Sequence, residues 1–304
     1  MRIVFMGTPA FAVPSLRAVA AEHEVSLVVT RPDAVRGRGK RLEPSPVKDE
    51  AQRLGIDVLE TSRIGADEVS RIAQERPDVI CVAAYGAILP DELLSVPALD
   101  IVNVHASLLP HGRGAAPIQR AVLEGDELAG VSIMRIVHEL DAGPYCSQAS
   151  LPIGSKSCAE VMAQVAELGA EKLIEALSNI AAGTAVWTEQ DEGQVSYAAK
   201  VQKAEMLLDP SDDALANVRR VQASLDAAPA RAKVCGRGVR VMEACVSPQE
   251  VAQGEVLVRK SRVFLGCAGE SLEVLSVKPD GKRQMPASAW ASGLRKGELR
   301  WERV

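Results

Sequence analysis

Short apolar runs alternate with amphipathic segments through the N-terminal part of the chain. Strands are predicted at 3–6, 25–30, 78–84 and 101–105. Each run is almost entirely apolar, which is typical of strands buried on both faces of a parallel sheet. The alternation therefore predicts an α/β fold with a Rossmann-like, open, mostly parallel sheet. Helical patterns lie between and after these strands, at 11–19, 47–54, 66–74 and 117–123.

The pattern changes further along the chain. Runs at 130–137 and 145–151 predict two longer strands, and Ser157 with Glu160 forms a capping-box pattern at the start of a long helix. Beyond residue 183 the periodicity fades into polar residues, which is typical of an extended linker. We therefore predict a first domain at 1–184, a linker at 185–205 and a second domain at 206–304.

The second domain has short strands in place of strand–helix repeats. A helix capped at 211–213 comes first, and about five short strands follow between 232 and 277. Such spacing predicts a small antiparallel β-barrel, OB-like, of the kind that often holds nucleic acid.

Composition excludes several classes of protein. The chain has 304 residues, enough for two ordinary domains, and no apolar run long enough to span a membrane. It starts directly in a strand, so we expect a cytoplasmic protein that is not exported. Its 6 cysteines form no Cys-x-x-Cys pair and no His lies at zinc-ligand spacing. We expect buried thiols and no metal.

Charge is unevenly divided along the chain. Residues 206–304 contain 16 Lys and Arg against 12 Asp and Glu, whereas residues 1–205 contain 19 against 28. A basic C-terminal part suggests a polyanionic partner. Chance variation in solvated surface charge explains the same split equally well.

Polar side chains interrupt a buried strand at its carboxyl end. Asn103 and His105 occupy alternate positions, so they share one face, and Asp141 follows in a turn beside Ala142-Gly143. An amide, an imidazole and a carboxylate suffice for acyl transfer without a metal, because the amide stabilises an oxyanion and the carboxylate orients the imidazole. Each residue alone also suits a structural role, as turn former, core histidine or cap.

Other candidate motifs give weaker evidence for a function. Gly7-Thr8-Pro9 lacks the remaining glycines of a dinucleotide fingerprint, and Gly37-Arg38-Gly39-Lys40 lacks the features of a phosphate-binding P-loop. His111 and His138 pair with no second His at metal-ligand spacing, so we assign both to surface or turn roles.

A basic loop follows the second predicted strand, at the same edge of the sheet. It contains Arg36, Arg38, Lys40 and Arg41 with interleaved glycines, which would let it fit along a phosphate backbone. The alternative is ordinary solvated surface. We favour nucleic-acid binding because the loop lies at the predicted site.

These motifs resemble a known family. The pattern Asn103-x-His105-x-Ser107-Leu108-Leu109-Pro110, followed by Leu140-Asp141-x-Gly143, is similar to that of formyltransferases that use 10-formyltetrahydrofolate. Within that superfamily, the segments 36–40, 44–48 and 114–120 resemble the methionyl-tRNA formyltransferases, as does the presence of a C-terminal barrel.

The resemblance implies residue roles and partners. Asn103, His105 and Asp141 would form a catalytic trio, and the basic loop and barrel would contact tRNA. The implied reaction is formyl transfer from 10-formyltetrahydrofolate to methionyl initiator tRNA in translation initiation. The resemblance does not bear on the expected oligomeric state, for which a monomer is our default. A formyltransferase for an amino sugar nucleotide or another amine, or a noncatalytic RNA-binding relative, are the alternatives. The implied folate-binding residues are Ser107, Leu108, Leu109, Pro110, Tyr85 and Gly86.

Overall fold

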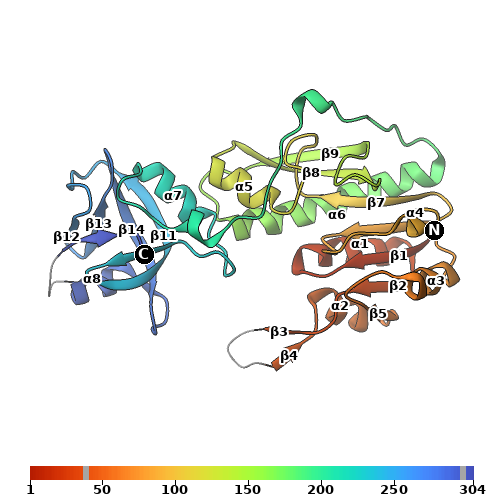
Figure 1. Cartoon of the computed structure of the whole chain (residues 1–304), viewed down its shortest axis with the longest axis horizontal. Helices are drawn as coiled ribbons and strands as arrows, with labels where there is room; N and C mark the ends of the chain where they lie inside the picture. The colour runs from red at the N-terminus through yellow and green to blue at the C-terminus, as the bar shows by residue number, and fades with distance from the viewer. Residues whose placement is uncertain (37–40, 295–298) are drawn as a thin grey trace. The chain divides into compact units, whose positions relative to one another are not determined.

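The computed structural model describes residues 1–36, 41–294 and 299–304, which fold into two compact units (Figure 1). Each unit has its own sheet and its own apolar core. Among the helices of the described residues, none combines the length and the apolar character needed to cross a membrane. Unit 1 comprises Met1–Pro117, Leu128–Pro152 and Met162–Ala198, and unit 2 comprises Ile118–Glu127, Ile153–Val161 and Ala199–Val304.

The sheet of unit 1 has seven strands in the order β5-β2-β1-β6-β7-β8-β9. The strands from β5 to β7 pair in parallel, and β8 and β9 are antiparallel additions. This confirms the predicted Rossmann-like, mostly parallel sheet. The strands are β1 (Arg2–Gly7), β2 (Glu24–Thr30), β5 (Val58–Glu60), β6 (Val79–Ala83), β7 (Asp100–His105), β8 (Leu128–Arg135) and β9 (Tyr145–Pro152).

Both faces of this sheet are packed, as nearly all-apolar strands require. On one face, Ile80 and Ile101 share a core with Ile72 of α3. On the other face, Gly169 of α6 is so close to β7 that a Cβ on it would lie 2.8 Å from Val104 Cγ1. The helical elements are α1 (Val13–Glu22), α2 (Pro46–Leu54), α3 (Ala66–Gln74), α4 (Asp91–Leu94) and α6 (Cys158–Ala182), with 3-10 turns η1 (Ala10–Ala12) and η2 (Glu192–Gln194).

The predicted start of the long helix is confirmed. The Ser157 hydroxyl accepts from the Glu160 backbone N–H at 3.3 Å, and the Glu160 carboxylate accepts from the Ser157 N–H at 2.8 Å. These two bonds satisfy N–H groups that the first turn of a helix leaves unpaired.

A buried carboxylate joins α1 to α2. Glu50 of α2 accepts hydrogen bonds from the guanidinium groups of Arg17 and Arg53. These bonds, led by that of Arg17, lower the pKa of Glu50 to about 2 although its burial opposes the shift. The pair of helices therefore depends on an ionised carboxylate.

Sequence periodicity missed a small hairpin at the base of the basic loop. Strands β3 (Ala34–Arg36) and β4 (Arg41–Glu43) pair antiparallel, with Arg36 opposite Arg41. Three-residue strands are too short to produce a clear alternation, so pairing across the hairpin decides them. The predicted loop residues Arg38 and Lys40 lie outside the described residues.

Unit 2 is a small β-barrel with strand order β12-β13-β14-β11-β10-β16 and with β15 added to β14. Its ends meet: the Val256 N–H donates to Leu299 O at 2.8 Å and the Trp301 N–H to Gly254 O at 2.9 Å. The predicted barrel is confirmed, but two-residue strands and a final helix were missed. The elements are α5 (Pro117–Glu124), η3 (Lys203–Met206), α7 (Ala214–Gln222), β10 (Arg231–Val234), β11 (Arg237–Ser247), β12 (Val256–Arg259), β13 (Arg262–Gly266), β14 (Ser271–Pro279), β15 (Met285–Pro286), α8 (Ala287–Leu294) and β16 (Trp301–Glu302).

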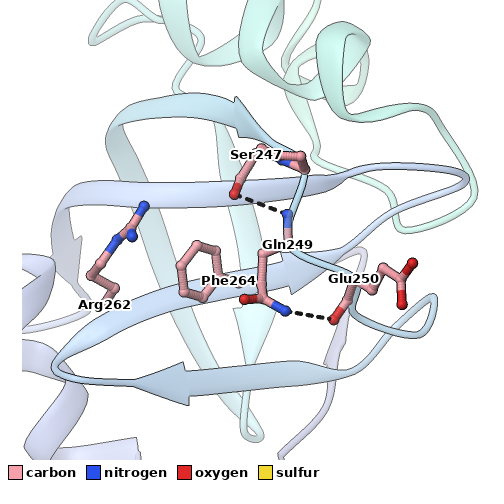
Figure 2. A pocket seen from close by; sticks show the side chains of 6 residues that line it. Ser247, Gln249, Glu250, Arg262 and Phe264 are labelled. Atoms are coloured by element: carbon pink, nitrogen blue, oxygen red, sulfur yellow. Dashed lines mark hydrogen bonds between the residues drawn. The ribbon is translucent and has the colours of Figure 1, made fainter.

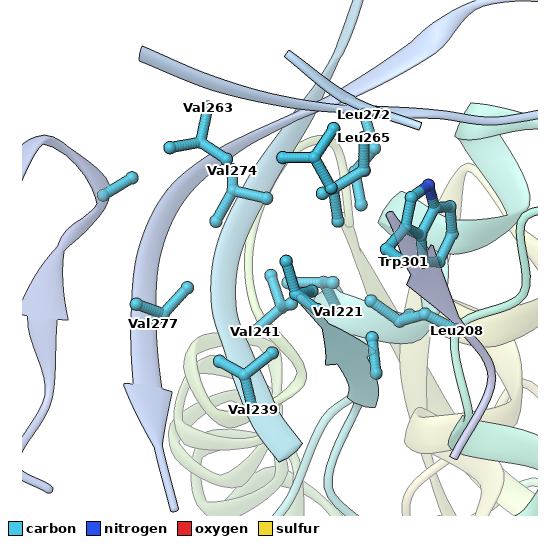
Figure 3. Close-up of a cluster of buried hydrophobic side chains, with 14 of the residues drawn as sticks. Leu208, Val221, Val239, Val241, Val263, Leu265, Leu272, Val274, Val277 and Trp301 are labelled. Atoms are coloured by element: carbon cyan, nitrogen blue, oxygen red, sulfur yellow. The ribbon is translucent and has the colours of Figure 1, made fainter. Parts of the chain in front are cut away.

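A bulge in β11 decides which of its side chains enter the barrel core (Figure 3). Val239 and Val241 face the core before the irregularity, whereas Ala244 and Val246 pack against it afterwards. The side-chain parity is thereby reversed, and Cys245 is exposed. The expectation of buried thiols is wrong for Cys245. All six thiols are free, and three of them are fully buried, namely Cys81, Cys158 and Cys267.

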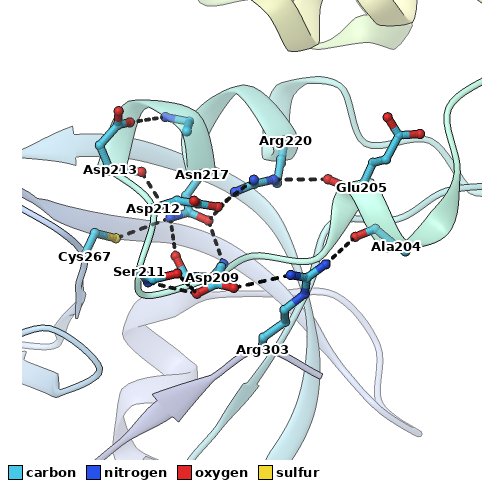
Figure 4. Close-up of polar contacts among 11 residues, drawn as sticks. Ala204, Glu205, Asp209, Ser211, Asp212, Asp213, Asn217, Arg220, Cys267 and Arg303 are labelled. Carbon is cyan, nitrogen blue, oxygen red and sulfur yellow. Dashed lines mark hydrogen bonds and ion pairs between the residues drawn. The ribbon is translucent and has the colours of Figure 1, made fainter.

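A buried amide holds the start of α7 (Figure 4). The Asn217 amide donates to the carbonyls of Asp209 and Asp213, and its oxygen accepts from the Asp209 N–H at 3.0 Å. Arg220 pairs with Asp212 at 2.6 Å. The acidic turn predicted to cap this helix is thus tied to it, and Asp213 accepts from the Ala216 N–H.

Candidate active site

Asn103 and His105 lie at the carboxyl end of β7. Asn103 pairs with Val82 of β6 on one side and with Met134 of β8 on the other, and His105 lies opposite Ser132. This edge of an open parallel sheet is where ligands bind in such folds. Among the described residues, the Asn103 side-chain amide has no hydrogen-bond partner in the protein, so its N–H groups are free to meet a ligand.

The His105 imidazole is buried and has a neighbour at each ring nitrogen. Nε2 lies 3.0 Å from Gly112 O, and Nδ1 lies 3.7 Å from Asp141 Oδ1. A carbonyl oxygen only accepts, so Nε2 carries a hydrogen in this arrangement. Nδ1 is therefore the ring nitrogen that faces the carboxylate.

Asp141 comes from a turn with an unusual backbone. Its φ is +51°, a left-handed conformation that costs a non-glycine residue roughly 1–2 kcal/mol. Its Oδ2 accepts from the Gly114 N–H at 2.9 Å, which leaves Oδ1 toward His105. The structure thus brings the predicted His105 and Asp141 together, with Asn103 two residues earlier on the same strand.

The segment after His105 is held by a hydrogen bond of its own and by two bonds to Ser132 of β8. Ser107 Oγ donates to His111 O at 2.6 Å, and Ser132 Oγ donates to Ser107 O at 2.6 Å. The Leu109 N–H donates to the Ser132 hydroxyl at 3.1 Å. The peptide bond from Leu109 to Pro110 is cis. Ser107 and Leu109 are buried, whereas Leu108 and Pro110 are partly exposed, so this segment contributes mostly shape to the site.

The predicted folate residues after β6 divide into a buried ring and an exposed backbone. The Tyr85 ring is buried, whereas Ala84 and Gly86 are exposed and have φ values of +45° and +82°. Thr8 Oγ1 donates to Tyr85 O at 3.0 Å, and Arg31 donates to Gly86 O at 2.7 Å. Tyr85 therefore contributes its main chain to this edge while its side chain fills the core.

Exposed apolar side chains lie on the segment after β6 and on the turn that carries Asp141. Ile88 is 92% exposed and Leu140 is 66% exposed. Their segments are tied together, because His138 Nδ1 lies 3.0 Å from Asp91 Oδ1 and Ile136 packs against the same core as the segment after β6. Exposed backbone amides with apolar side chains nearby suit a flat heteroaromatic ligand.

Comparison with known proteins identifies the family. Residues 1–177 match the model of the formyl transferase family, and residues 200–295 match that of the formyl transferase C-terminal domain. The chain belongs to the formyl transferase family. It is 43% identical over 292 residues to methionyl-tRNA formyltransferase of Methylococcus capsulatus, covering 94% of this chain and 95% of that one. The protein of the same name from Halorhodospira halophila is 42% identical over 97% of this chain and 96% of that one.

Solved structures share the fold at lower identity. HypX from Aquifex aeolicus, in complex with tetrahydrofolic acid, matches with a TM-score of 0.67 at 21% identity over 98% of this chain and 48% of that one. WlaRD, a sugar 3N-formyl transferase, matches with a TM-score of 0.67 at 14% identity over 93% of this chain and 99% of that one. Both share the fold of this formyl transferase.

Sequence reasoning missed two residues that support the trio. Gln190 donates to the carbonyls of Asp141 and Gly143, and Arg113 donates to the Gln190 side-chain oxygen. Gln190 lies in the segment that sequence analysis assigned to a linker, which runs through unit 1 as far as Ala198. Only the glycines beside Arg113 hinted at a close backbone approach there.

The remaining predicted site residues of this formyl transferase lie elsewhere. Arg36 and Arg41 end the paired strands β3 and β4, and the residues between them are outside the described part of the chain. His111 and His138 are exposed, as expected for surface roles. Within the described residues no cluster of His, Cys, Asp or Glu could hold a metal ion.

Unit 2 has a shallow hollow of about 430 Å³ on the barrel (Figure 2). Phe264 and Arg262 line it with the segment 247–250. Arg262 is already paired with Glu273, and its guanidinium lies over the Phe264 ring at 4.9 Å. The guanidinium of Arg262 is therefore already engaged at this hollow.

Proposed function

We propose that this chain transfers the formyl group of 10-formyltetrahydrofolate to the α-amino group of methionyl initiator tRNA. One observation supports this proposal most directly. In a member of the formyl transferase family, His105 Nδ1 lies 3.7 Å from Asp141 Oδ1, and the unpaired amide of Asn103 lies two residues before His105. Relatives named methionyl-tRNA formyltransferase match nearly the whole chain, which supports methionyl-tRNA as the acceptor.

In the proposed reaction, the amine nitrogen of the acceptor attacks the formyl carbon, and the bond from that carbon to the folate nitrogen breaks. Asn103 donates a hydrogen bond to the oxyanion of the tetrahedral intermediate. The proton lost by the amine ends on the folate nitrogen. An α-amine has a pKa of about 7.7 to 8.0, so part of it is neutral and nucleophilic near pH 7 without a strong base.

His105 and Asp141 would stabilise the oxyanion charge and transfer the proton that reaches the folate nitrogen. A proton on Nδ1 of His105 would lie toward Asp141 and help to neutralise the developing oxyanion, while the Gly112 carbonyl holds the ring through Nε2. Asp141 would then help to pass a proton, through water, to the departing nitrogen. The carboxylate is kept in position for both steps by the Gly114 N–H.

The folate would occupy the edge formed by the segment after β6 and the segment that contains Leu140. The exposed main chain of Ala84 and Gly86 offers amide donors and acceptors to a pterin edge, and Ile88 offers an apolar surface. Ser107 to Pro110 would shape the wall of the pocket. The basic loop and the barrel would contact the tRNA backbone.

Three features complete the proposal. The protein acts as a monomer, and it works in the cytoplasm, where charged initiator tRNA and folate are found together. Residues 1–184 would carry the catalysis and residues 206–304 would bind tRNA, while the segment between them, predicted to be a linker, belongs to unit 1 as far as Ala198. Sedimentation of the purified protein checks the monomer.

A formylation assay tests the function. The purified protein is supplied with 10-formyltetrahydrofolate and one acceptor at a time: methionyl initiator tRNA, methionyl elongator tRNA, or an amino sugar nucleotide. We expect rapid formylation of the initiator tRNA alone. Formylation of the amino sugar without that of the tRNA would identify a different acceptor, and tRNA binding without any transfer would identify a noncatalytic relative.

A further inference from the structure

The side-chain amide of Gln190 is bonded on three sides by groups around the Asp141 turn. Its Nε2 donates to Asp141 O at 2.8 Å and to Gly143 O at 2.7 Å, and its Oε1 accepts from Arg113 Nε at 2.9 Å. An amide NH2 has two hydrogens, so the two carbonyls use both of them. Every polar atom of this side chain is therefore engaged at the active-site turn.

These partners also determine which way the amide faces. The reversed orientation would set the amide oxygen against two carbonyl oxygens, and its NH2 against the N–H of Arg113. Arg113 is itself buried and paired with Glu192 at 2.7 Å, so it presents its Nε in a constant position. The amide thus points its two donors at the turn.

The turn has little freedom to compensate if these bonds are lost. Asp141 holds a left-handed backbone conformation, and a Cβ on Gly143 would lie 2.0 Å from Arg135 O. The turn is therefore packed against Arg135 on one side and held by Gln190 through two carbonyls on either side of Ala142. Loss of those bonds leaves the strained backbone of Asp141 held on the Arg135 side alone, so that it can relax and move the carboxylate.

The same extended segment also fixes the other partner of the Asp141 carboxylate. Gly114, whose N–H donates to Oδ2, packs closely against Ala198, since a Cβ on Gly114 would be 2.9 Å from Ala198 O. Arg113 exchanges backbone bonds with Ser196 and Ala198. The two groups that bond to the Asp141 turn, the Gln190 side chain and the Gly114 N–H, therefore both belong to or pack against the segment from Gln190 to Ala198.

We propose that Gln190 is a positioning residue for formyl transfer: its two amide donors hold the Asp141 turn so that the carboxylate faces Nδ1 of His105. This inference rests on the proposed function and deepens it, because it adds to the site a residue that never meets the substrate. The effect of Gln190 is exerted through Asp141.

Kinetics of substituted proteins test the proposal. Gln190→Ala is expected to lower kcat about 10- to 100-fold, as displacement of a catalytic group by about 1 Å does, with KM for both substrates within about twofold of the wild type. Gln190→Glu keeps the size and the acceptor for Arg113 but has no donors, so it should lose at least as much. Gln194→Ala is the matched control, since that exposed amide bonds only to the Asp191 carboxylate, and kcat should not change.

A double substitution separates positioning from general loss of structure. When Asp141 is already Asn, Gln190→Ala should lower kcat by less than about twofold further, because the two residues act as a unit. An equal loss in both backgrounds, or recovery of kcat in Gln190→Glu, would overturn the proposal in favour of a packing role. Normal kcat in Gln190→Ala would overturn it as well.

A spectroscopic readout keeps this inference distinguishable from the proposed function. The chain has 4 histidines, and the ¹⁵N imidazole signals of His105 can be assigned with His105→Gln. Gln190→Ala should move these signals toward their positions in Asp141→Asn, while those of His23, which follows α1, stay unchanged. Unmoved His105 signals would overturn the positioning role, whereas a wild-type protein without formyl transfer would refute only the function.

Discussion

Oδ1 of Asp141 lies 3.7 Å from Nδ1 of His105, while Nε2 of the same ring lies 3.0 Å from Gly112 O. The distance to the carboxylate is longer than a hydrogen bond, and the distance to the carbonyl is within one. The ring is therefore anchored through Nε2, and Nδ1 is the nitrogen at which a proton can be held or released.

Removal of the Asn103 amide should reduce the rate and leave the fold intact. If Asn103 donates to the oxyanion, Asn103→Ala loses about 2.7–4 kcal/mol of transition-state stabilisation, a fall in kcat of about 10²- to 10³-fold. Formylation kinetics measure the loss. Asn179→Ala, at the exposed end of α6, is the control. Turnover within a few-fold of the wild type would refute the oxyanion role.

Replacement of the Asp141 carboxylate should show its effect in kcat. The oxygen of Asn could still accept from the Gly114 N–H, but its amide would offer Nδ1 of His105 a donor in place of a negative charge. We expect Asp141→Asn to lower kcat by about 10²- to 10⁴-fold, by analogy with a carboxylate that orients a catalytic histidine. The exposed Asp126→Asn serves as control. A change confined to KM would contradict the assignment.

Acid should remove the contribution of Glu50 to stability. The pKa of Glu50 is about 2 in the folded protein against an ordinary 4.5, so its ionised form stabilises the fold above about pH 4.5, and this contribution is lost as the pH falls toward 2. Loss of charged hydrogen bonds should make Glu50→Gln about 1.5–3 kcal/mol less stable at pH 7.

Urea unfolding of the wild type and of Glu50→Gln, at pH 7 and at steps below pH 4.5, measures this difference. The difference in free energy of unfolding between the wild type and Glu50→Gln should decrease as the pH falls. Glu124→Gln, on an exposed side chain, should show no gap at any pH. A gap that widens in acid would contradict the expected sign.

Neutralisation of the basic loop should weaken tRNA use without affecting folate. Each of Arg36, Arg38 and Lys40 that contacts a phosphate should contribute about one unit to the slope of log affinity against log salt concentration. Arg38→Gln should therefore raise KM for methionyl initiator tRNA and flatten its salt dependence, with KM for 10-formyltetrahydrofolate unchanged. Arg63→Gln, an exposed cation elsewhere, is the control. If the slope of log affinity for tRNA against log salt concentration did not change, the loop would be ordinary solvated surface.

Local patterns predicted the regular elements well where the elements were long. The apolar strands of the parallel sheet and the capping box at Ser157 depend on neighbours a few residues apart, which the sequence displays directly. The exposure of Cys245 was not predictable in this way. It follows from a bulge in β11 that reverses side-chain parity, and that bulge is visible only in the pairing with β14.

The sequence by itself determined that Asn103 and His105 share a face at the end of a buried strand, because parity along a strand is a local property. It also placed Asp141 in a turn and identified the reaction through its motifs. Only the tertiary structure decided that His105 is anchored to Gly112, that Gly114 holds the carboxylate, and that Gln190 holds the turn. These contacts join segments far apart in the chain, so no periodicity records them and the whole fold must form before they exist.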